Sequence, residues 1–427
     1  RRMPSAANSV YFNPMNEPLT HAAGAAPNGS VYPIIRLFAS LGLMTVGTVG
    51  MYIGIVGLKP IAAEFGISRG MGSLPYALFM VGYGVGNIAH GWIADRFGTM
   101  LPALIGSVAF PVGLILSAQA ETLWQFFATL SLLAGLLGSS AVFAPIIADI
   151  SYWFTRRRGL AVAFVFSGTY FAGAIWPPIL QHLIDANGWR SALVTVGYIC
   201  LAIMVPLSLL LYRKPAHLVE AKDAARESRF IRPLGLAPNT LQCTLCLAGI
   251  GCCVGMSMPQ VHIVAYASDL GFTAQRGAEM LSLMLACGIV SRIISGWISD
   301  RIGGMRTLLL GGGLQGAVLA AFLVADNLTS LYIVAACFGL SQGGVVPSYA
   351  IIVRTFFPAR EAGWRIGTTL FSTIIGMAFG GWLAGFLYDL TGSYTMSFIN
   401  ALAFNTMTFL IIAFLLTRAR HLQVVTR

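Results

Sequence analysis

Charged residues are scarce in this 427-residue sequence. Asp, Glu, Lys and Arg together make up 10% of it, whereas apolar residues make up 57%. A soluble protein of this length needs far more charged side chains to cover its surface. The scarcity therefore excludes a chain of ordinary soluble domains and predicts a polytopic membrane protein.

Acidic residues are scarcer than basic ones, which leaves a formal net charge of +11. In a soluble protein this excess would suggest a nucleic-acid partner. If the N-terminus is cytoplasmic, all but five of the 26 Lys and Arg residues lie on the cytoplasmic side; the five are Arg69, Arg190 and Arg276 outside, and Lys59 and Arg292 within helices. This bias is the positive-inside rule, so we expect cytoplasmic termini, contact with anionic lipids and no nucleic acid.

Cysteine is also sparse, and all seven cysteines lie in apolar segments. Cys243 and Cys246 form a CxxC pair, but no second ligand pair stands in a solvated loop. We therefore expect packing cysteines, with neither a metal site nor a cofactor. The predicted helices hold no Ser/His/Asp set either, so an enzyme is not expected.

Long apolar runs make up most of the sequence. A run of about 20 residues crosses the hydrocarbon core of a bilayer. We find twelve, at 34–58, 72–93, 99–118, 123–149, 159–184, 190–212, 237–267, 277–298, 306–325, 329–353, 364–388 and 393–416. The expected fold class is an all-α membrane protein with twelve transmembrane helices, acting as a monomer in the cytoplasmic (inner) membrane.

The chain contains an internal duplication. Three pairs share an offset of 205 residues: GWIADRFG at 91–98 and GWISDRIG at 296–303, VGM at 49–51 and at 254–256, and Gly66 and Gly271. The duplication predicts two pseudo-symmetric bundles of six helices, at 33–212 and 237–416. Flanking them we expect a disordered cytoplasmic N-terminal tail at 1–32, a charged cytoplasmic linker at 213–236 and a cytoplasmic C-terminal tail at 417–427. Duplicated halves suit alternating access to a site between them.

This architecture resembles the major facilitator superfamily over nearly the whole chain. The marker of that family is a G-x-x-x-D-R-x-G loop after the second helix, which serves as a cytoplasmic latch. Here its residues are Gly91, Asp95, Arg96 and Gly98, and in the second half Gly296, Asp300, Arg301 and Gly303. The resemblance implies the same role for both copies.

The chemistry of the first copy suits a latch. Gly91 and Gly98 allow close helix approach and a tight turn. Asp95 is a short anion that can meet the positive N-terminus of a helix from the other half. Arg96 is expected to pair with Asp149, near the cytoplasmic end of the fourth helix. The alternative is a solvated turn.

Arg292 is the clearest candidate for substrate binding. It stands eight residues before Asp300, about 12 Å along the eighth helix, too deep for its head to reach water easily. No acidic residue within a turn or two neutralises it. A guanidinium matches a carboxylate, so we predict an anionic substrate; a structural pairing is the alternative.

Other helix residues are weaker candidates. Lys59 lies in the outer part of the first helix, where it could instead snorkel to the surface. His262 follows Pro259 in the seventh helix; it could titrate in a cavity or only bond a neighbouring helix.

The repeat offset adds two further candidates, because it maps Arg292 onto Asn87 and Gly288 onto Tyr83. We therefore expect Tyr83 and Asn87 to face the cavity, unless they pack between helices.

The stretch 152–191 resembles the monocarboxylate transporter family. It has an aromatic pair, a basic cluster followed by Gly-Leu-Ala, a small-residue helix with proline, and Gly-Trp-Arg; GSY at 392–394 also matches that family. The resemblance implies a lactate-like or pyruvate-like substrate, Arg292 as the carboxylate-binding arginine and Lys59 as the first-helix lysine. Animal members carry an aspartate one turn before the arginine, where this chain has Gly288. Proton symport would then run through Lys59 or His262.

Two other functions remain open at this stage. Oxalate/formate exchangers share much of the pattern, but a dianion favours a second deep cation, and the eleventh helix at 366–388 has none. A membrane sensor that binds without transport would need a domain to receive the signal. Neither the carboxylate nor the choice between symport and exchange follows from the sequence.

Overall fold

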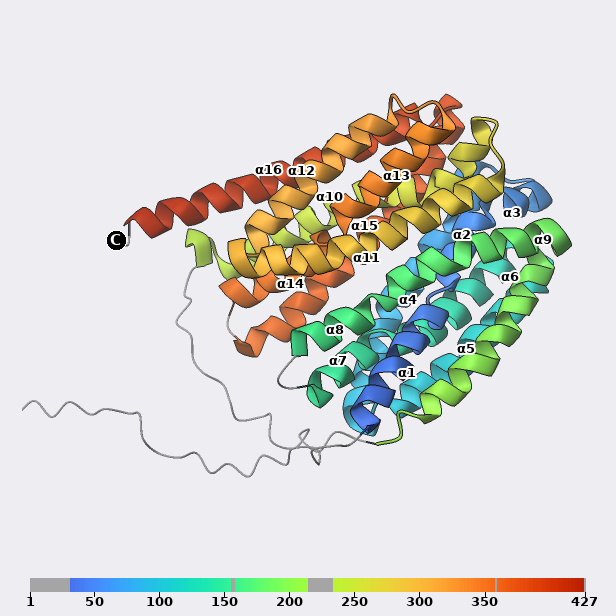
Figure 1. The fold of residues 1–427 in the computed structure, drawn as a ribbon, viewed down its shortest axis with the longest axis horizontal. Helices are drawn as coiled ribbons and strands as arrows, with labels where there is room; N and C mark the ends of the chain where they lie inside the picture. Colours follow the sequence, from blue (N-terminus) through green and yellow to red (C-terminus); the bar gives the residue numbers. More distant parts are fainter. Residues whose placement is uncertain (1–30, 155–157, 214–232, 358, 426–427) are drawn as a thin grey trace, which may run out of the picture.

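The computed structural model describes residues 31–154, 158–213, 233–357 and 359–425, and the regular structure within these ranges is helical (Figure 1). Most of the expected N-terminal tail at 1–32 and most of the expected linker lie outside the described residues. The last helix continues to Val425, through most of the expected C-terminal tail at 417–427.

The helices fall into two groups along the chain. The first comprises α1 (Tyr32–Gly47), α2 (Gly50–Val56), α3 (Leu58–Phe65), α4 (Arg69–Phe97), α5 (Met100–Ala118), α6 (Leu123–Ala128), a π-helical segment (Thr129–Gly138), a 3-10 turn (Ser139–Val142), α7 (Ala144–Trp153), α8 (Arg158–Phe166) and α9 (Gly168–Leu209). The second comprises a 3-10 turn (Pro233–Gly235), α10 (Pro238–Asp269), α11 (Ala274–Ile302), α12 (Gly304–Phe322), α13 (Leu328–Gln342), α14 (Val345–Phe356), α15 (Ala359–Thr391) and α16 (Thr395–Val425). Figure 1 shows the blue-to-green first group beside the yellow-to-red second group.

Ten helical segments in the described residues are long and apolar enough to cross a membrane. One of them, Leu160–Leu209, has 50 residues, which is about twice the length of one crossing. It bends at Gly188, whose φ of 78° is not helical, and so supplies two crossings. The helix α4, with 29 residues, is not among the ten but is long enough for one further crossing. Two crossings from Leu160–Leu209, one from each of the other nine segments and one from α4 make up the twelve crossings that the sequence predicts.

The duplication is visible in the backbone. Gly66 and Gly271 follow the ends of α3 and α10 with φ of 63° and 87°, and Gly98 and Gly303 follow α4 and α11 with φ of 89° and 81°. Glycine is the residue that adopts positive φ at little cost. The same turns therefore recur 205 residues apart, which supports a structural repeat of helices and turns.

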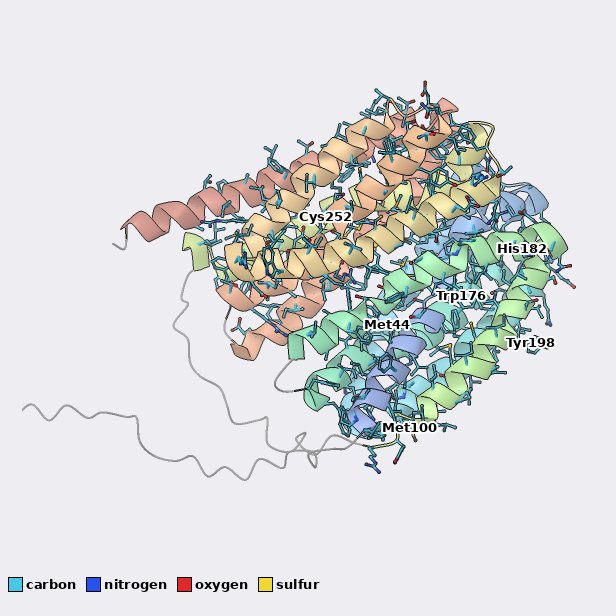
Figure 2. The ribbon with its side chains drawn as sticks, viewed as in Figure 1. Met44, Met100, Trp176, His182, Tyr198 and Cys252 are labelled. Carbon is cyan, nitrogen blue, oxygen red and sulfur yellow. The ribbon has the colours of Figure 1, made fainter. Side chains whose placement is uncertain are left out.

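The two groups meet along α4 with α15 and along α9 with α11. Glycines permit the close approach: a Cβ on Gly385 would lie 2.8 Å from the carbonyl oxygen of Arg69, and one on Gly173 would overlap Cδ1 of Leu285 on α11. Such small-residue contacts are typical of helices packed in lipid. Figure 2 shows side chains filling the helix interfaces, among them Trp176 on α9, whose Nε1 donates to the Thr45 carbonyl at 3.1 Å.

Several crossings are broken near their middle. The first breaks between α1 and α2, the fourth passes through the π-helical segment, and the tenth breaks at Gly343 and Gly344, between α13 and α14. Broken helices expose backbone carbonyls to the interior, which is where transporters place their sites. The break at Gly343 provides a carbonyl that Arg292 uses.

Candidate functional site: a cavity around Arg292

A cavity of about 150 Å³ lies between the two groups of helices. Its lining comes from α2, α4, α8, α9 and Phe143 on one side and from α10, α11, α14 and α15 on the other. Among the described lining residues, Arg292 is the one that carries a charge; the uncharged polar residues are Thr169, Gln260, Thr373 and four tyrosines, Tyr52, Tyr76, Tyr83 and Tyr170. The other lining side chains are apolar.

The repeat relates several of the residues that line the cavity. Four pairs of lining residues are separated by the 205-residue offset: Met51 and Met256, Ile55 and Gln260, Met80 and Leu285, and Thr169 and Ile374. The repeated VGM triplet supplies the first pair. Equivalent positions of the two halves therefore face each other across one space, as expected for a transporter built from repeats.

Arg292 extends from α11 and is 8% exposed. Its Nε donates to the Gly343 carbonyl and its Nη1 to the Phe166 carbonyl in the other half, both at 3.3 Å. The guanidinium also lies 4.3 Å from the ring centre of Phe166 and 4.1 Å from that of Tyr170. Cation–π contacts and carbonyls orient the cation without neutralising it.

Arg292 has unused binding capacity. Among the described residues, no carboxylate forms an ion pair with it, and the cavity lining contains no acidic residue. A guanidinium has five N–H donors, of which two have the carbonyl acceptors described above. A buried cation without an anion is costly, several kcal/mol in general. A carboxylate entering the cavity would relieve that cost.

Gly288 explains how Tyr170 reaches Arg292. A Cβ at this position would lie 2.6 Å from Cε1 of Tyr170, so the tyrosine ring occupies the space that a side chain at 288 would need. The position lies one turn before Arg292, where the resemblance places an aspartate in animal relatives. In this chain an aromatic ring takes the place of a neighbouring carboxylate.

Of the two residues found through the repeat, Tyr83 lines the cavity and Asn87 does not. The Tyr83 hydroxyl is buried and has no hydrogen-bond partner among the described residues. The Asn87 amide donates to the Tyr83 carbonyl at 2.8 Å and accepts from the backbone N–H of Ala144 at 3.0 Å. Asn87 thus packs between helices and holds the start of α7, which was the alternative to a position in the cavity.

Lys59 belongs to a charged cluster away from the cavity, at the end where α4 begins. Its Nζ lies 2.7 Å from Oδ1 of Asp269, and Nη2 of Arg69 donates to the same oxygen at 2.7 Å. We call Lys59, Arg69, Asp269, Asp389 and Tyr394 the Asp269 cluster. Lys59 and Arg69 come from the first half and Asp269 from the second, so these ion pairs join the halves. Lys59 and Arg292 therefore do not line the same cavity in this conformation.

Asp389 strengthens the same junction. Its carboxylate, on α15, accepts from the backbone N–H groups of Arg69 and Gly70 at 2.8 and 2.6 Å. These are the first two residues of α4, where unpaired N–H groups and the helix dipole favour an anion. An aspartate from one half therefore meets a helix N-terminus of the other, the interaction expected for Asp95, but at the opposite end of the molecule.

His262 lies beneath the Asp269 cluster and is fully buried. Its Nε2 lies 2.8 Å from the Gly381 carbonyl, which can only accept, so this nitrogen carries the proton and Nδ1 accepts from the Tyr394 hydroxyl at 2.9 Å. Burial raises the pKa of the Tyr394 phenol, although Arg69 opposes the shift, so Tyr394 stays a donor. The Arg69 Nη1 donates to the same hydroxyl at 2.9 Å. His262 is absent from the described lining of the cavity.

The expected pairing of Arg96 with Asp149 is wrong. Asp149 forms a bidentate pair with Arg36 of α1, with N–O distances of 2.6 and 2.7 Å, and accepts from the Thr99 hydroxyl at 3.0 Å. Arg36 and Asp149 face each other inside the first bundle, where both are buried. The Arg96 guanidinium lies instead 4.0 Å from the ring centre of Trp92.

The described side chains of the latch residues make no ion pair or hydrogen bond between the halves in this conformation. A Cβ on Gly91 or Gly296 would meet nothing within 4 Å, so the expected close approach is not made there. Asp300 and Arg301 are exposed, and Arg301 lies over the Trp297 ring at 3.6 Å, repeating the arrangement of the first copy. The Asp95 side chain lies outside the described part. Gly98 and Gly303 do form the expected tight turns.

Sequence reasoning missed Asp269, although a signal was present. Asp269 lies 205 residues after Glu64, so each half carries an acid two residues before its repeated glycine. Glu64 accepts from the Trp189 Nε1 at 2.5 Å and from the Arg190 Nε at 2.7 Å, both in the Gly-Trp-Arg motif. Glu64 therefore connects helices within the first half, whereas Asp269 connects the two halves.

A cavity with one cation, enclosed between duplicated halves of membrane-spanning helices, defines the class of protein: a membrane transporter. The profile of the Major Facilitator Superfamily matches residues 38–367 and 245–426, and the chain belongs to this superfamily. The expected fold class is confirmed.

Within the superfamily, the chain is related to the monocarboxylate transporters. It is 29% identical to monocarboxylate transporter 13 of Bos taurus over 73% of this chain and 72% of that protein. It is 30% identical to monocarboxylate transporter 11 of Mus musculus over 73% of this chain and 71% of that protein. This confirms the resemblance drawn from the stretch 152–191.

Solved structures share the fold. An inward-facing, occupied bacterial homolog of the human lysosomal transporter Spinster matches with a TM-score of 0.72 at 14% identity, over 92% of this chain and 97% of that one. A POT family transporter in complex with 5-aminolevulinic acid matches with a TM-score of 0.70 at 13% identity, over 90% and 95%.

Proposed function

We propose that the protein moves a small monocarboxylate anion, such as lactate or pyruvate, across the cytoplasmic membrane by alternating access. The observation that carries the proposal is Arg292, the one charged residue in the described lining of a cavity shared by both halves. One unpaired guanidinium suits one carboxylate. The relation to monocarboxylate transporters supports the same substrate class.

The conformation suggests how the two ends of the cavity would open in turn. At the Asp269 end, ion pairs and the contact of Asp389 with α4 join the halves. At the latch end, the described side chains of both copies make no ion pair across the halves. With both termini in the cytoplasm, the latch end faces inward, so this arrangement is open to the inside. Opening to the outside would separate Lys59 from Asp269, and the Lys59 ammonium could then bind a substrate anion.

Proton symport is the mode of coupling that we propose. The cavity holds one cation, which suits a monoanion better than the dianion of an oxalate-type exchanger. His262 is linked through the Tyr394 hydroxyl to Arg69, and so to the contacts that hold the Asp269 end closed. A proton on Nδ1 of His262 would remove the acceptor of the Tyr394 hydroxyl and loosen this end.

Transport by proteoliposomes containing Arg292→Ala tests the proposal. We expect uptake of labelled pyruvate or lactate to fall about 100-fold, because removing one partner of a buried ionic contact costs roughly 3 kcal/mol. Arg276→Ala is the matched control, because Arg276 is exposed on the same helix and pairs with Glu279. Unchanged uptake by Arg292→Ala, with the control also active, would refute the assignment.

The same vesicles distinguish symport from exchange. If a proton is co-transported, an imposed pH gradient drives uptake and an uncoupler abolishes it. If the protein is an exchanger, uptake requires an anion trapped inside the vesicle and ignores the uncoupler.

A further inference from the structure

We propose that the Arg292 cavity selects a monocarboxylate with a bulky apolar body, aromatic or branched aliphatic, over a three-carbon acid. This inference rests on the proposed role of Arg292 and specifies the rest of the substrate. It follows from the size of the cavity, the chemistry of its walls and the charges that the walls lack.

The cavity is larger than a three-carbon acid requires. One water molecule needs about 10–15 Å³ of cavity volume. The cavity, at about 150 Å³, therefore accommodates roughly ten water-sized groups. Pyruvate would fill about half of it. The remainder would hold water against apolar walls, which is unfavourable, whereas a phenyl or isobutyl group would fill the same space.

Methionines form much of the wall. Met51 and Met80 come from the first half, and Met256 and Met377 from the second. Methionine is flexible and polarisable, so it adapts to apolar groups of varied outline and contacts aromatic rings favourably. These four side chains therefore suit a large apolar group held between the halves.

An aromatic row leads from the wall to the cation. The ring centres of Tyr83 and Phe143 lie 5.3 Å apart, those of Phe143 and Phe166 lie 5.4 Å apart, and Phe166 lies under the Arg292 guanidinium. A substrate whose carboxylate binds Arg292 would place its body along this row. Aromatic side chains favour rings at such separations.

The described lining of the cavity has no partner for a second charged group, and Tyr83 supplies an unpaired buried hydroxyl there. The Tyr52 hydroxyl donates to the Thr169 carbonyl at 3.0 Å, and the Thr373 hydroxyl donates to the Leu370 carbonyl at 2.7 Å, so both donors are already used. The described lining contains no acid to pair with an ammonium and no second cation for another carboxylate. Burying either charge unpaired is costly, so amino acids and dicarboxylates should be rejected.

The test is uptake by wild-type proteoliposomes of four labelled acids: pyruvate, 4-methyl-2-oxopentanoate, phenylpyruvate and phenylalanine. Phenylalanine matches phenylpyruvate in shape but carries an ammonium. We expect KM for the two bulky oxo acids to be at least about tenfold below that for pyruvate, with no uptake of phenylalanine. Equal or tighter use of pyruvate, or uptake of phenylalanine, would overturn this inference and leave the proposed function standing. Uptake of none of the oxo acids would count against both.

Two wall variants test the surface responsible. Met51→Gln and Met256→Gln keep side-chain length but add a polar amide, and we expect each to raise KM for phenylpyruvate about tenfold and KM for pyruvate by a clearly smaller factor. Met396→Gln, at an exposed position at the start of α16, should change neither. Equal changes in KM for both acids would contradict the proposal that the methionine wall contacts the apolar body of the substrate. The wild-type series decides the question if a wall variant does not fold.

Discussion

The buried pair of Arg36 and Asp149 offers the sharpest test of how the first bundle is held together. Their side chains are 1% and 2% exposed, and both guanidinium–carboxylate bonds are short. Removing one partner of a buried pair leaves the other charge unpaired, which costs about 3–5 kcal/mol. We therefore expect Asp149→Asn or Arg36→Ala to destabilise the folded protein by that amount. Replacing both by apolar residues, as in Arg36→Met with Asp149→Leu, should recover most of the loss.

Thermal unfolding in detergent, followed by the remaining monodisperse fraction, measures the effect. The matched control is Glu64→Gln, whose pair with Arg190 is about one-third to one-half exposed and should be worth 1 kcal/mol or less, by the usual estimate for surface pairs (~0.2–1 kcal/mol). Arg96→Ala should change stability no more than the control does, because Arg96 lies on Trp92 and not on Asp149. The reasoning fails if Asp149→Asn costs no more than Glu64→Gln, or if Arg96→Ala costs more than Arg36→Ala.

Two further predictions concern the junction and the site. Asp389→Ala removes the anion at the start of α4, which is worth about 1 kcal/mol for capping contacts, so amide hydrogen exchange there should become roughly fivefold faster; Asp326→Ala, at the same end but without a contact to α4, should leave it unchanged. Gly288→Ala should displace the Tyr170 ring from Arg292 and raise KM for the carboxylate about tenfold, whereas Gly312→Ala, where a Cβ meets open space, should not. Normal exchange in the first variant, or an unchanged KM in the second, would count against these contacts.

The crossings could be predicted from sequence because membrane thickness fixes their length. Runs of about 20 apolar residues and a repeat offset were enough to place them. The ends were less certain. The first run was ended at residue 58, but the chain stays helical through α3 to Phe65, because polar residues near a membrane surface do not stop a helix. The second helix likewise includes most of the GWIADRFG phrase and ends at Phe97.

The site was only partly predictable because a charge in an apolar run does not say which neighbour its side chain faces. Arg292 was found because it is deep and unpaired, and Tyr83 because the repeat maps it onto the same cavity. Lys59 and His262 carry the same kind of signal, yet they face the Asp269 cluster, since their partners Asp269 and Tyr394 come from distant segments. Arg36 resembled an ordinary basic residue at a helix start, so its pairing with Asp149 was missed.

The paired lining of the cavity has a consequence for how a substrate would travel. Met51 and Met256, which the repeat relates, both line the cavity, but the position equivalent to Arg292 is Asn87, which holds the start of α7. The cation of the described lining therefore has no counterpart in the first half. If Arg292 binds the substrate as proposed, the anion would be held by α11 and would move with the second half, while its uncharged end slides over the aromatic and methionine surface of the first half. The substrate would then move together with the second half and relative to the first.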